Sequence, residues 1–335
     1  MEAHYGNIGA EMASAGERTL SGSSVKGRTK ARSLLSISDL STQDLEGMLA
    51  RMGSLKPAIK RRETLSDLRG LAVGLFFEKP STRTRTSFEV ATIRLGGHPI
   101  YLAADDLQTS RGEPIKDTAR ILGGYLDLIV GRVYAHETLR SLAEYSGVPV
   151  LNGLSDLEHP TQVISDLFTI SESKAKLKGL KLAFIGDGDN VCNSLLLGAS
   201  LVGMDMVAAC PRGYSPDADV LRRAKENAKR SGSTVAVVGD AKEAAVDSDV
   251  LYTDVWVSMG EEKERERRLR AFRGFQINSE TLKLASKDAI VMHCLPAHRG
   301  MEITDEVIEG KQSVVWRQAE NKLYGAAAAL DFVKA

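Results

Sequence analysis

The sequence lacks the features that mark disulfide-rich, membrane-spanning and nucleic-acid-binding proteins. It has three cysteines among 335 residues, Cys192, Cys210 and Cys294, and their wide spacing suits neither a disulfide framework nor a zinc-ligand pattern. No apolar run reaches the length of a membrane span. The formal net charge of zero argues against nucleic acid or an anionic membrane as the main partner. Together these absences predict a cytoplasmic globular protein.

The N-terminal stretch, residues 1–32, also lacks a sustained apolar period and is rich in Gly, Ser and Ala. It has no apolar core of the kind that a secretory signal needs. Its acidic residues Glu2, Glu11 and Glu17 argue against an organelle transit peptide. We therefore interpret this stretch as a mobile extension that precedes the fold.

From Ser33 onward, apolar runs alternate with amphipathic segments, which is typical of an α/β fold. We predict two doubly wound parallel-sheet domains, residues 33–170 and 171–315, followed by a final helix over 316–335. The strands are expected at 71–77, 99–102, 126–130 and 149–152 in the first domain, and at 180–185, 206–209, 235–238, 250–253 and 289–292 in the second.

Two further local patterns give predictions about helices. The helix that begins near Ile115 is expected to stop at Gly123-Gly124, because glycine disfavours a helix interior. The run from Glu261 to Arg268 mixes acidic and basic residues, so we interpret it as a solvated helix face.

The stretch from Pro80 to Glu89 follows a predicted strand and opens a predicted helix, with Ser81 in the N-cap position. A helix N-terminus is already partly positive and usually attracts acidic residues, yet Arg83 and Arg85 add positive charge here. A bound anion would resolve this conflict, and phosphate fits best because hydroxyls, free N–H groups and a guanidinium all donate to it. The alternative is an ordinary cap whose arginines point into solvent.

Other polar residues also fall at the carboxyl ends of predicted strands, where open parallel sheets bind ligands. They include Arg132, His159 with Gln162, Asp187 to Asn190, Asp254 to Gly260 and His293 to Pro296. Gly186 and Gly188 suggest a dinucleotide site, but Val191 occupies the place of the third glycine and no clear ribose-binding acid follows. The sequence therefore disfavours a dinucleotide-dependent dehydrogenase.

Three of these stretches closely resemble the signatures of one enzyme family. The segments Ser81–Arg85, His159–Gln162 and His293–Pro296 are similar to the three motifs of the aspartate/ornithine carbamoyltransferases. The resemblance spans nearly the whole chain, from about Ser33 to the final helix. The segment Asp254–Gly260 resembles the ornithine-side loop of the branch that acts on ornithine.

The resemblance implies that the first domain binds carbamoyl phosphate and that the final helix returns to this domain. Arg132, His159 and Gln162 would converge on the carbamoyl group and polarise its carbonyl, and Cys294 would complete the catalytic set. Gln108 would reach into a neighbouring subunit, which implies a homo-oligomer, a trimer or a multiple of trimers, with shared active sites. The residues implied around carbamoyl phosphate are Ser81, Thr82, Arg83, Thr84, Gln108, Arg132, His159, Gln162, Cys294, Leu295 and Lys322.

The second domain would by the same resemblance bind L-ornithine, through Asn190, Asp254, Ser258 and Met259. The neutral δ-amine would attack the carbamoyl carbon and phosphate would leave, giving L-citrulline without a metal, a cofactor or a covalent enzyme intermediate. We interpret Cys294 as a thiol that assists binding, because the sequence shows no base beside it that would activate a nucleophile.

One position departs from the family. Lys322 stands where the family usually has an arginine that helps to bind carbamoyl phosphate. Lysine cannot reproduce the bidentate fork of arginine, so either Lys322 serves as a point charge, or the affinity is weaker, or another group substitutes. Arg317 lies about one and a half turns earlier and is not an obvious substitute on the same helix face.

Two alternatives to ornithine transfer remain at this point. A relative of the same family could use another amine acceptor, such as putrescine or an acylated ornithine, and the Ser258-Met259-Gly260 loop argues against it. A catalytically silent homologue could act as an assembly or regulatory subunit. The intact set of Arg83, Arg132, His159 and Cys294 argues against a silent copy.

Overall fold

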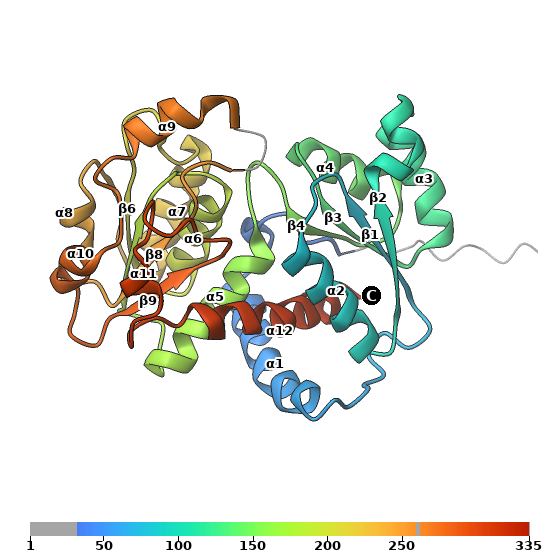
Figure 1. The fold of residues 1–335 in the computed structure, drawn as a ribbon. Coiled ribbons are helices and arrows are strands. Elements are labelled where there is room, and N and C mark those ends of the chain that lie inside the picture. The colour runs from blue at the N-terminus through green and yellow to red at the C-terminus, as the bar shows by residue number, and fades with distance from the viewer. Residues whose placement is uncertain (1–31, 259–261, 335) are drawn as a thin grey trace, which may run out of the picture. The chain divides into compact units, whose positions relative to one another are not determined.

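The structure is a computed structural model that describes residues 32–258 and 262–334, which belong to one compact unit (Figure 1). The predicted extension, residues 1–32, lies outside the described residues except for Arg32. Met259, one of the residues expected at the ornithine site, lies outside them as well. No helix in the described part of the chain is long and apolar enough to cross a membrane.

The first sheet has four parallel strands in the order β2-β1-β3-β4. Alternate residues of β1 face two different cores. Val73, Leu75 and Phe77 pack into the core formed with α1, α2, α5 and α12, whereas Phe76 packs into the core formed with α3 and α4. The elements are β1 (Ala72–Phe77), β2 (His98–Ala103), β3 (Leu128–Arg132), β4 (Val150–Leu154), α1 (Thr42–Lys60), α2 (Thr82–Arg94), α3 (Ile115–Tyr125), α4 (His136–Tyr145) and α5 (Pro160–Lys174), with 3-10 turns η1 (Ile37–Asp39), η2 (Ala104–Asp106) and η3 (Gln108–Arg111).

The second sheet has five parallel strands in the order β7-β6-β5-β8-β9. Its central strand β5 also faces two cores, with Leu182 and Phe184 on the side of α6 and α7, and Ala183 and Ile185 on the side of α8. The predicted fold class, two doubly wound parallel sheets, is confirmed. The elements are β5 (Lys181–Ile185), β6 (Asp205–Ala209), β7 (Val235–Val238), β8 (Val250–Thr253), β9 (Ile290–His293), α6 (Asn190–Leu201), α7 (Ala218–Ser231), α8 (Ala241–Ala245), η4 (Glu262–Glu264), α9 (Arg265–Ala271), α10 (Ser279–Leu284) and α11 (Asp305–Ile308).

The final helix α12 (Val315–Val333) crosses back from the second sheet and packs against α1, α2 and α5, as predicted (Figure 1). Gly325 permits the close approach of α12 to α5, because a Cβ atom at this position would lie 2.0 Å from the Oγ of Ser165. The helix therefore reaches the carboxyl-end side of the first sheet, where Lys322 becomes part of the site described below.

Two local predictions were wrong for identifiable reasons. Helix α3 does not stop at Gly123-Gly124 but continues to Tyr125. Gly123 is needed there for packing, since a Cβ atom would lie 1.8 Å from the backbone oxygen of Ser146. The solvated face expected over residues 261–268 is only partly correct. Arg268 is buried, forms an ion pair with Asp187 and donates from Nε to the Trp256 carbonyl at 2.6 Å.

Candidate active site

A cavity of about 560 Å³ lies where the carboxyl ends of strands from both sheets face each other. Side chains at or just after the ends of β1, β3, β4, β5, β8 and β9 line it, together with Lys322 from α12. The structure thus brings together thirteen of the residues expected from the sequence: Ser81, Thr82, Arg83, Thr84, Arg132, His159, Gln162, Asn190, Asp254, Ser258, Cys294, Leu295 and Lys322.

Gln108 is not part of this cavity. It begins the 3-10 turn η3, is exposed, and its side-chain oxygen lies 3.4 Å from Nη1 of Arg111. Gln108 therefore does not line the cavity of its own chain.

The N-terminus of α2 forms one wall of the cavity and carries the expected phosphate-binding features. Ser81 is the N-cap residue, and its Oγ accepts a hydrogen bond from the Thr84 amide at 3.2 Å. The first turn contains no acidic residue, so the positive end of the helix dipole is not neutralised locally. The amides of Thr82 and Arg83, at the first two helical positions, remain for an external acceptor.

Arg85, which follows in the same turn, points away from the cavity. Its Nε lies 2.9 Å from Glu89 Oε1, and its guanidinium lies 3.5 Å from the centre of the Tyr101 ring. Arg83 and Arg85 therefore have different surroundings, and only Arg83 lines the cavity.

Two buried cations stand beside Arg83. Arg132 ends β3, and its Nη1 lies 3.5 Å from Thr84 Oγ1, whereas its buried Nε has no partner among the described residues. Burial, together with the charge of Arg83, lowers the pKa of Arg132 to about 10. Burial and the charge of Arg132 lower the pKa of Lys322 to about 8. Both shifts mean that the surroundings of these two side chains disfavour their positive charges, which an anion would stabilise.

His159 contacts Lys322, and this contact determines which ring nitrogen carries the proton. Nζ of Lys322 lies 3.2 Å from Nε2 of His159, and because an ammonium group only donates, Nε2 accepts. Burial and the charges of Lys322 and Arg132 hold the pKa of His159 well below its usual 6.5. The ring is therefore neutral with its proton on Nδ1, which has no partner in the part of the chain that the structure describes.

Gln162 is also oriented by its neighbours. Its Oε1 accepts from Nζ of Lys322 at 2.6 Å, and its Nε2 donates to Oδ1 of Asp166 at 2.9 Å. Since Lys322 can only donate, the amide oxygen of Gln162 lies on the Lys322 side. Gln162 consequently contributes a hydrogen-bond acceptor to this end of the cavity.

On the opposite wall, Asp254 and Cys294 lie together at the ends of β8 and β9. Burial raises the pKa of the Cys294 thiol well above its usual 9, and the Asp254 carboxylate raises it further. Burial also raises the pKa of Asp254, while His293 and a hydrogen bond with Cys294 act in the opposite direction. The thiol is therefore neutral at pH 7, which is unfavourable for a cysteine nucleophile.

Three potential metal ligands, Asp254, His293 and Cys294, place ligand atoms within 4.8 Å of one another. Both ring nitrogens of His293 are already used, because Nδ1 accepts from the Leu295 amide at 2.9 Å and Nε2 lies 3.0 Å from Oε1 of Glu302. A metal ion would have to displace one of these bonds and remove the thiol proton of Cys294. The arrangement fits a support for the Cys294-Leu295 turn better than a metal site.

Three ionisable residues that line the cavity were not expected from the sequence. Lys79 precedes the Ser81 cap, Arg265 begins α9, and His298 follows the His293–Pro296 motif. Arg265 lies in the run of mixed charges that we interpreted as a solvated helix face, and this pattern gave no indication that Arg265 lines the cavity. Lys79 and His298 lie within two residues of predicted motifs, and this proximity could have indicated that they line the cavity.

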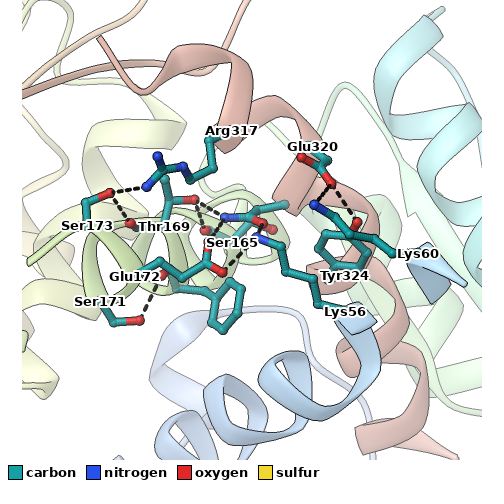
Figure 2. Close-up of polar contacts among 12 residues, drawn as sticks. Lys56, Lys60, Ser165, Thr169, Ser171, Glu172, Ser173, Arg317, Glu320 and Tyr324 are labelled. Atoms are coloured by element: carbon teal, nitrogen blue, oxygen red, sulfur yellow. Dashed lines mark hydrogen bonds and ion pairs between the residues drawn. The ribbon is translucent and has the colours of Figure 1, made fainter. Parts of the chain in front are cut away.

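A second polar network holds the helix that carries Lys322 (Figure 2). Lys56 of α1 donates to Glu172 of α5 at 2.7 Å and to Oδ1 of Asn321 at 2.9 Å. Asn321, next to Lys322 in α12, donates in turn to Thr169 Oγ1 and to Glu172, both at 2.9 Å. Because Asn321 is fully buried, these bonds fix the rotation of α12 at the point where Lys322 enters the cavity.

Comparisons with known proteins agree with this geometry. Residues 32–172 match the carbamoyl-P binding domain of aspartate/ornithine carbamoyltransferase, and residues 178–333 match the Asp/Orn binding domain. The ornithine carbamoyltransferase of Methanosarcina acetivorans is 51% identical over 297 residues, which cover 89% of this chain and 97% of the relative.

Solved structures give the same result. The ornithine carbamoyltransferase of Pyrococcus furiosus has a TM-score of 0.87 at 47% identity, with 91% of this chain and 97% of that chain covered. The enzyme of Campylobacter jejuni has a TM-score of 0.84 at 42% identity, with coverages of 90% and 98%. The chain belongs to the aspartate/ornithine carbamoyltransferase family.

Proposed function

We propose that this chain transfers the carbamoyl group of carbamoyl phosphate to the δ-amine of L-ornithine, giving L-citrulline and phosphate. The family and the ornithine carbamoyltransferases that resemble the chain over about nine-tenths of its length support this assignment. The observation that carries it is a single cavity with two chemically different walls. One wall offers cations and a helix N-terminus, and the other offers Asp254 beside a neutral thiol.

The phosphate of carbamoyl phosphate binds at the N-terminus of α2 in this proposal. The amides of Thr82 and Arg83 and the hydroxyls of Ser81 and Thr84 would donate to its oxygens. Arg83 and Lys322 supply charge, so Lys322 acts as a point charge in place of a guanidinium fork. The lowered pKa values of Lys322 and Arg132 support this role, because both indicate an excess of positive charge in the cavity that a bound phosphate would neutralise.

The carbamoyl group then lies between Arg132, His159 and Gln162. Arg132 and Nδ1–H of His159 would donate to the carbonyl oxygen, where negative charge develops as the amine attacks. Gln162 has its acceptor on the Lys322 side, so we assign it to the amino group of the carbamoyl moiety. This differs from the role expected from the sequence, in which Gln162 polarised the carbonyl together with Arg132 and His159.

Ornithine binds against the other wall, with Asn190, Asp254 and Ser258 around its amino-acid end. Met259, which lies outside the described residues, is assigned to the same end from the family resemblance alone. The δ-amine forms a C–N bond to the carbamoyl carbon, the C–O bond to phosphate breaks, and the proton that the amine loses passes to the departing phosphate. The positive charges of Arg132 and Lys322 near the carbamoyl group disfavour an ammonium ion beside them, which favours the neutral δ-amine that the attack requires. Cys294 holds Asp254 in place and does not act as a nucleophile.

We further propose that the enzyme is cytoplasmic and is a homo-oligomer, a trimer or a multiple of trimers. The exposed position of Gln108, outside the cavity of its own chain, supports a shared active site. We divide the chain into a carbamoyl-phosphate domain over 33–170, an ornithine domain over 171–315 and a C-terminal helix over 316–335, with an extension over 1–32. Sedimentation that yields a monomer with full activity would contradict the shared site.

The acceptor assignment is tested with purified protein, carbamoyl phosphate and a panel of ornithine, putrescine, N-acetylornithine and aspartate. We expect carbamoylated product from ornithine, with the other amines at least about 100-fold less efficient. Putrescine and N-acetylornithine lack or alter the α-amino and carboxylate groups that the second wall would bind, and aspartate has no δ-amine. Product from putrescine alone would refute the ornithine assignment. No product from any amine would support the silent homologue and refute the enzyme.

A further inference from the structure

A buried carboxylate, Asp166 of α5, lies directly behind Gln162 and is fully buried. It accepts three hydrogen bonds. Nε2 of Gln162 donates to Oδ1 at 2.9 Å, Nε2 of Gln318 donates to Oδ1 at 2.8 Å, and the hydroxyl of Tyr252 donates to Oδ2 at 2.8 Å. We call these four residues the Asp166 network.

The directions of the two amide hydrogen bonds in the network are fixed from its two ends. At one end, Lys322 can only donate, so Oε1 of Gln162 accepts from it and Nε2 of Gln162 must face Asp166. At the other end, the backbone amide of His293 donates to Oε1 of Gln318 at 2.9 Å, so Nε2 of Gln318 also faces Asp166. An ionised carboxylate, which is acceptor-only, satisfies both amides.

We propose that Asp166 is a positioning residue for carbamoyl transfer: it holds the Gln162 amide with its oxygen toward Lys322 and the cavity. Without this acceptor, Gln162 could rotate by half a turn and present its NH₂ group to Lys322 and to the amino group of carbamoyl phosphate. Donors would then face donors. The inference rests on the proposed function, because it assigns the cavity-facing oxygen of Gln162 to the carbamoyl amino group.

The network also reaches the second sheet, since Tyr252 lies on β8 and His293 on β9. Tyr252 touches Asp166 but not Gln162, so it provides a matched control. Tyr252→Phe removes the hydroxyl that donates to Asp166 and accepts from Nε2 of Gln318 at 3.1 Å, and it leaves the Gln162–Asp166 bond. A purely structural role of the network would therefore be disturbed by this change as well. The orientation of Gln162, in contrast, would not be disturbed by Tyr252→Phe.

The test is a double-mutant cycle on the affinity for phosphonoacetamide, in which a methylene group replaces the bridging oxygen of carbamoyl phosphate. We expect Asp166→Ala and Gln162→Ala each to weaken binding about 10- to 30-fold, and the double variant to bind within threefold of Gln162→Ala. Tyr252→Phe should bind within threefold of the wild type. Losses that multiply in the double variant, or unchanged binding in Asp166→Ala, would overturn the proposal.

A second pair of variants keeps the shape of the site in case Asp166→Ala does not fold. Gln162→Glu places a carboxylate against Asp166 and should weaken binding more than Gln162→Ala, because like charges then face each other. Adding Asp166→Asn to Gln162→Glu should raise the affinity for phosphonoacetamide at least tenfold, since the Asn amide can donate to the new carboxylate. No restoration would overturn the proposal. Failure of the wild type to bind phosphonoacetamide would instead refute the proposed function.

Discussion

Lys322 is expected to take up a proton when carbamoyl phosphate or its analogue binds at alkaline pH. Its pKa of about 8, against 10.5 for an ordinary lysine, corresponds to about 3 kcal/mol by which burial and Arg132 disfavour the ammonium form. A phosphate group beside Nζ reverses this, because an opposite charge within a few ångströms favours the charged form. Binding and protonation of Lys322 are therefore linked.

The size of the effect follows from the pKa. With a value of about 8, the Lys322 amine of the free enzyme is about 10% neutral at pH 7, about half neutral at pH 8 and about 90% neutral at pH 9. Binding should thus take up about 0.5 proton at pH 8 and about 0.9 at pH 9, and the affinity should fall about tenfold between pH 7 and pH 9. Arg132, with a pKa of about 10, adds about 0.1 proton at pH 9.

The assay is titration calorimetry with phosphonoacetamide in buffers of different ionisation enthalpy, which reports the protons exchanged on binding. Lys322→Arg is the matched control, because arginine stays charged throughout this range. At pH 7 the variant should bind phosphonoacetamide as well as the wild type does. At pH 9 it should bind about tenfold more tightly than the wild type at that pH, and its binding should lack the proton uptake that Lys322 contributes. Equal proton uptake by the two proteins at pH 9 would refute the reasoning.

The same shift has a consequence for the ligand-free protein. The folded pKa of Lys322 lies below the unfolded value, so between about pH 8 and pH 10.5 the unfolded chain binds more protons than the folded chain. The contribution of Lys322 to the free energy of unfolding therefore rises with pH across this window. Burying the ammonium group is unfavourable at neutral pH, and ligand binding offsets that cost.

Three further predictions concern single positions. Arg83→Ala should weaken phosphonoacetamide binding at least about 100-fold, because a charged donor to the phosphate is lost, and Arg85→Ala should leave it within threefold; equal effects would contradict the assignment of Arg83. Cys294→Ser should raise the KM for ornithine while kcat falls less than about tenfold, whereas a nucleophile would lose more than about 1,000-fold. Gly123→Ala should lower the free energy of unfolding by about 1–3 kcal/mol. Gly124→Ala, whose new Cβ meets no atom within 4 Å, should raise it by about 0.5–1 kcal/mol. Chemical denaturation measures both variants, and equal changes in the free energy of unfolding would contradict this prediction.

Much of the fold was predictable because both sheets are buried on two faces, so their strands are short apolar runs. The limits of this signal are visible at β3, which we expected two residues early. Its last two residues, Gly131 and Arg132, are not apolar, yet they continue the strand because they pair with Phe76 and Phe77 of β1. Backbone pairing alone, which leaves no mark in the sequence, extends the strand to the point where Arg132 enters the cavity.

The candidate site was predictable where function depends on short motifs and not where it depends on distant partners. Arg83 stands out because its positive charge conflicts with an ordinary helix start. Asp166 gives no such signal, since Tyr252 and Gln318 lie 86 and 152 positions away in the sequence. Arg268 likewise appeared to be one charge in a solvated run, because its pairing with Asp187 depends on the folded chain.

The most direct test of carbamoyl transfer at this cavity is a time course of L-citrulline and phosphate formed by the purified chain from carbamoyl phosphate and L-ornithine. The wild type should form the two products in a ratio of one to one, and Arg132→Met should lower the rate of both by at least about 100-fold, because it removes a buried donor to the developing charge. Phosphate release without citrulline, or citrulline formed at the wild-type rate by Arg132→Met, would contradict the account.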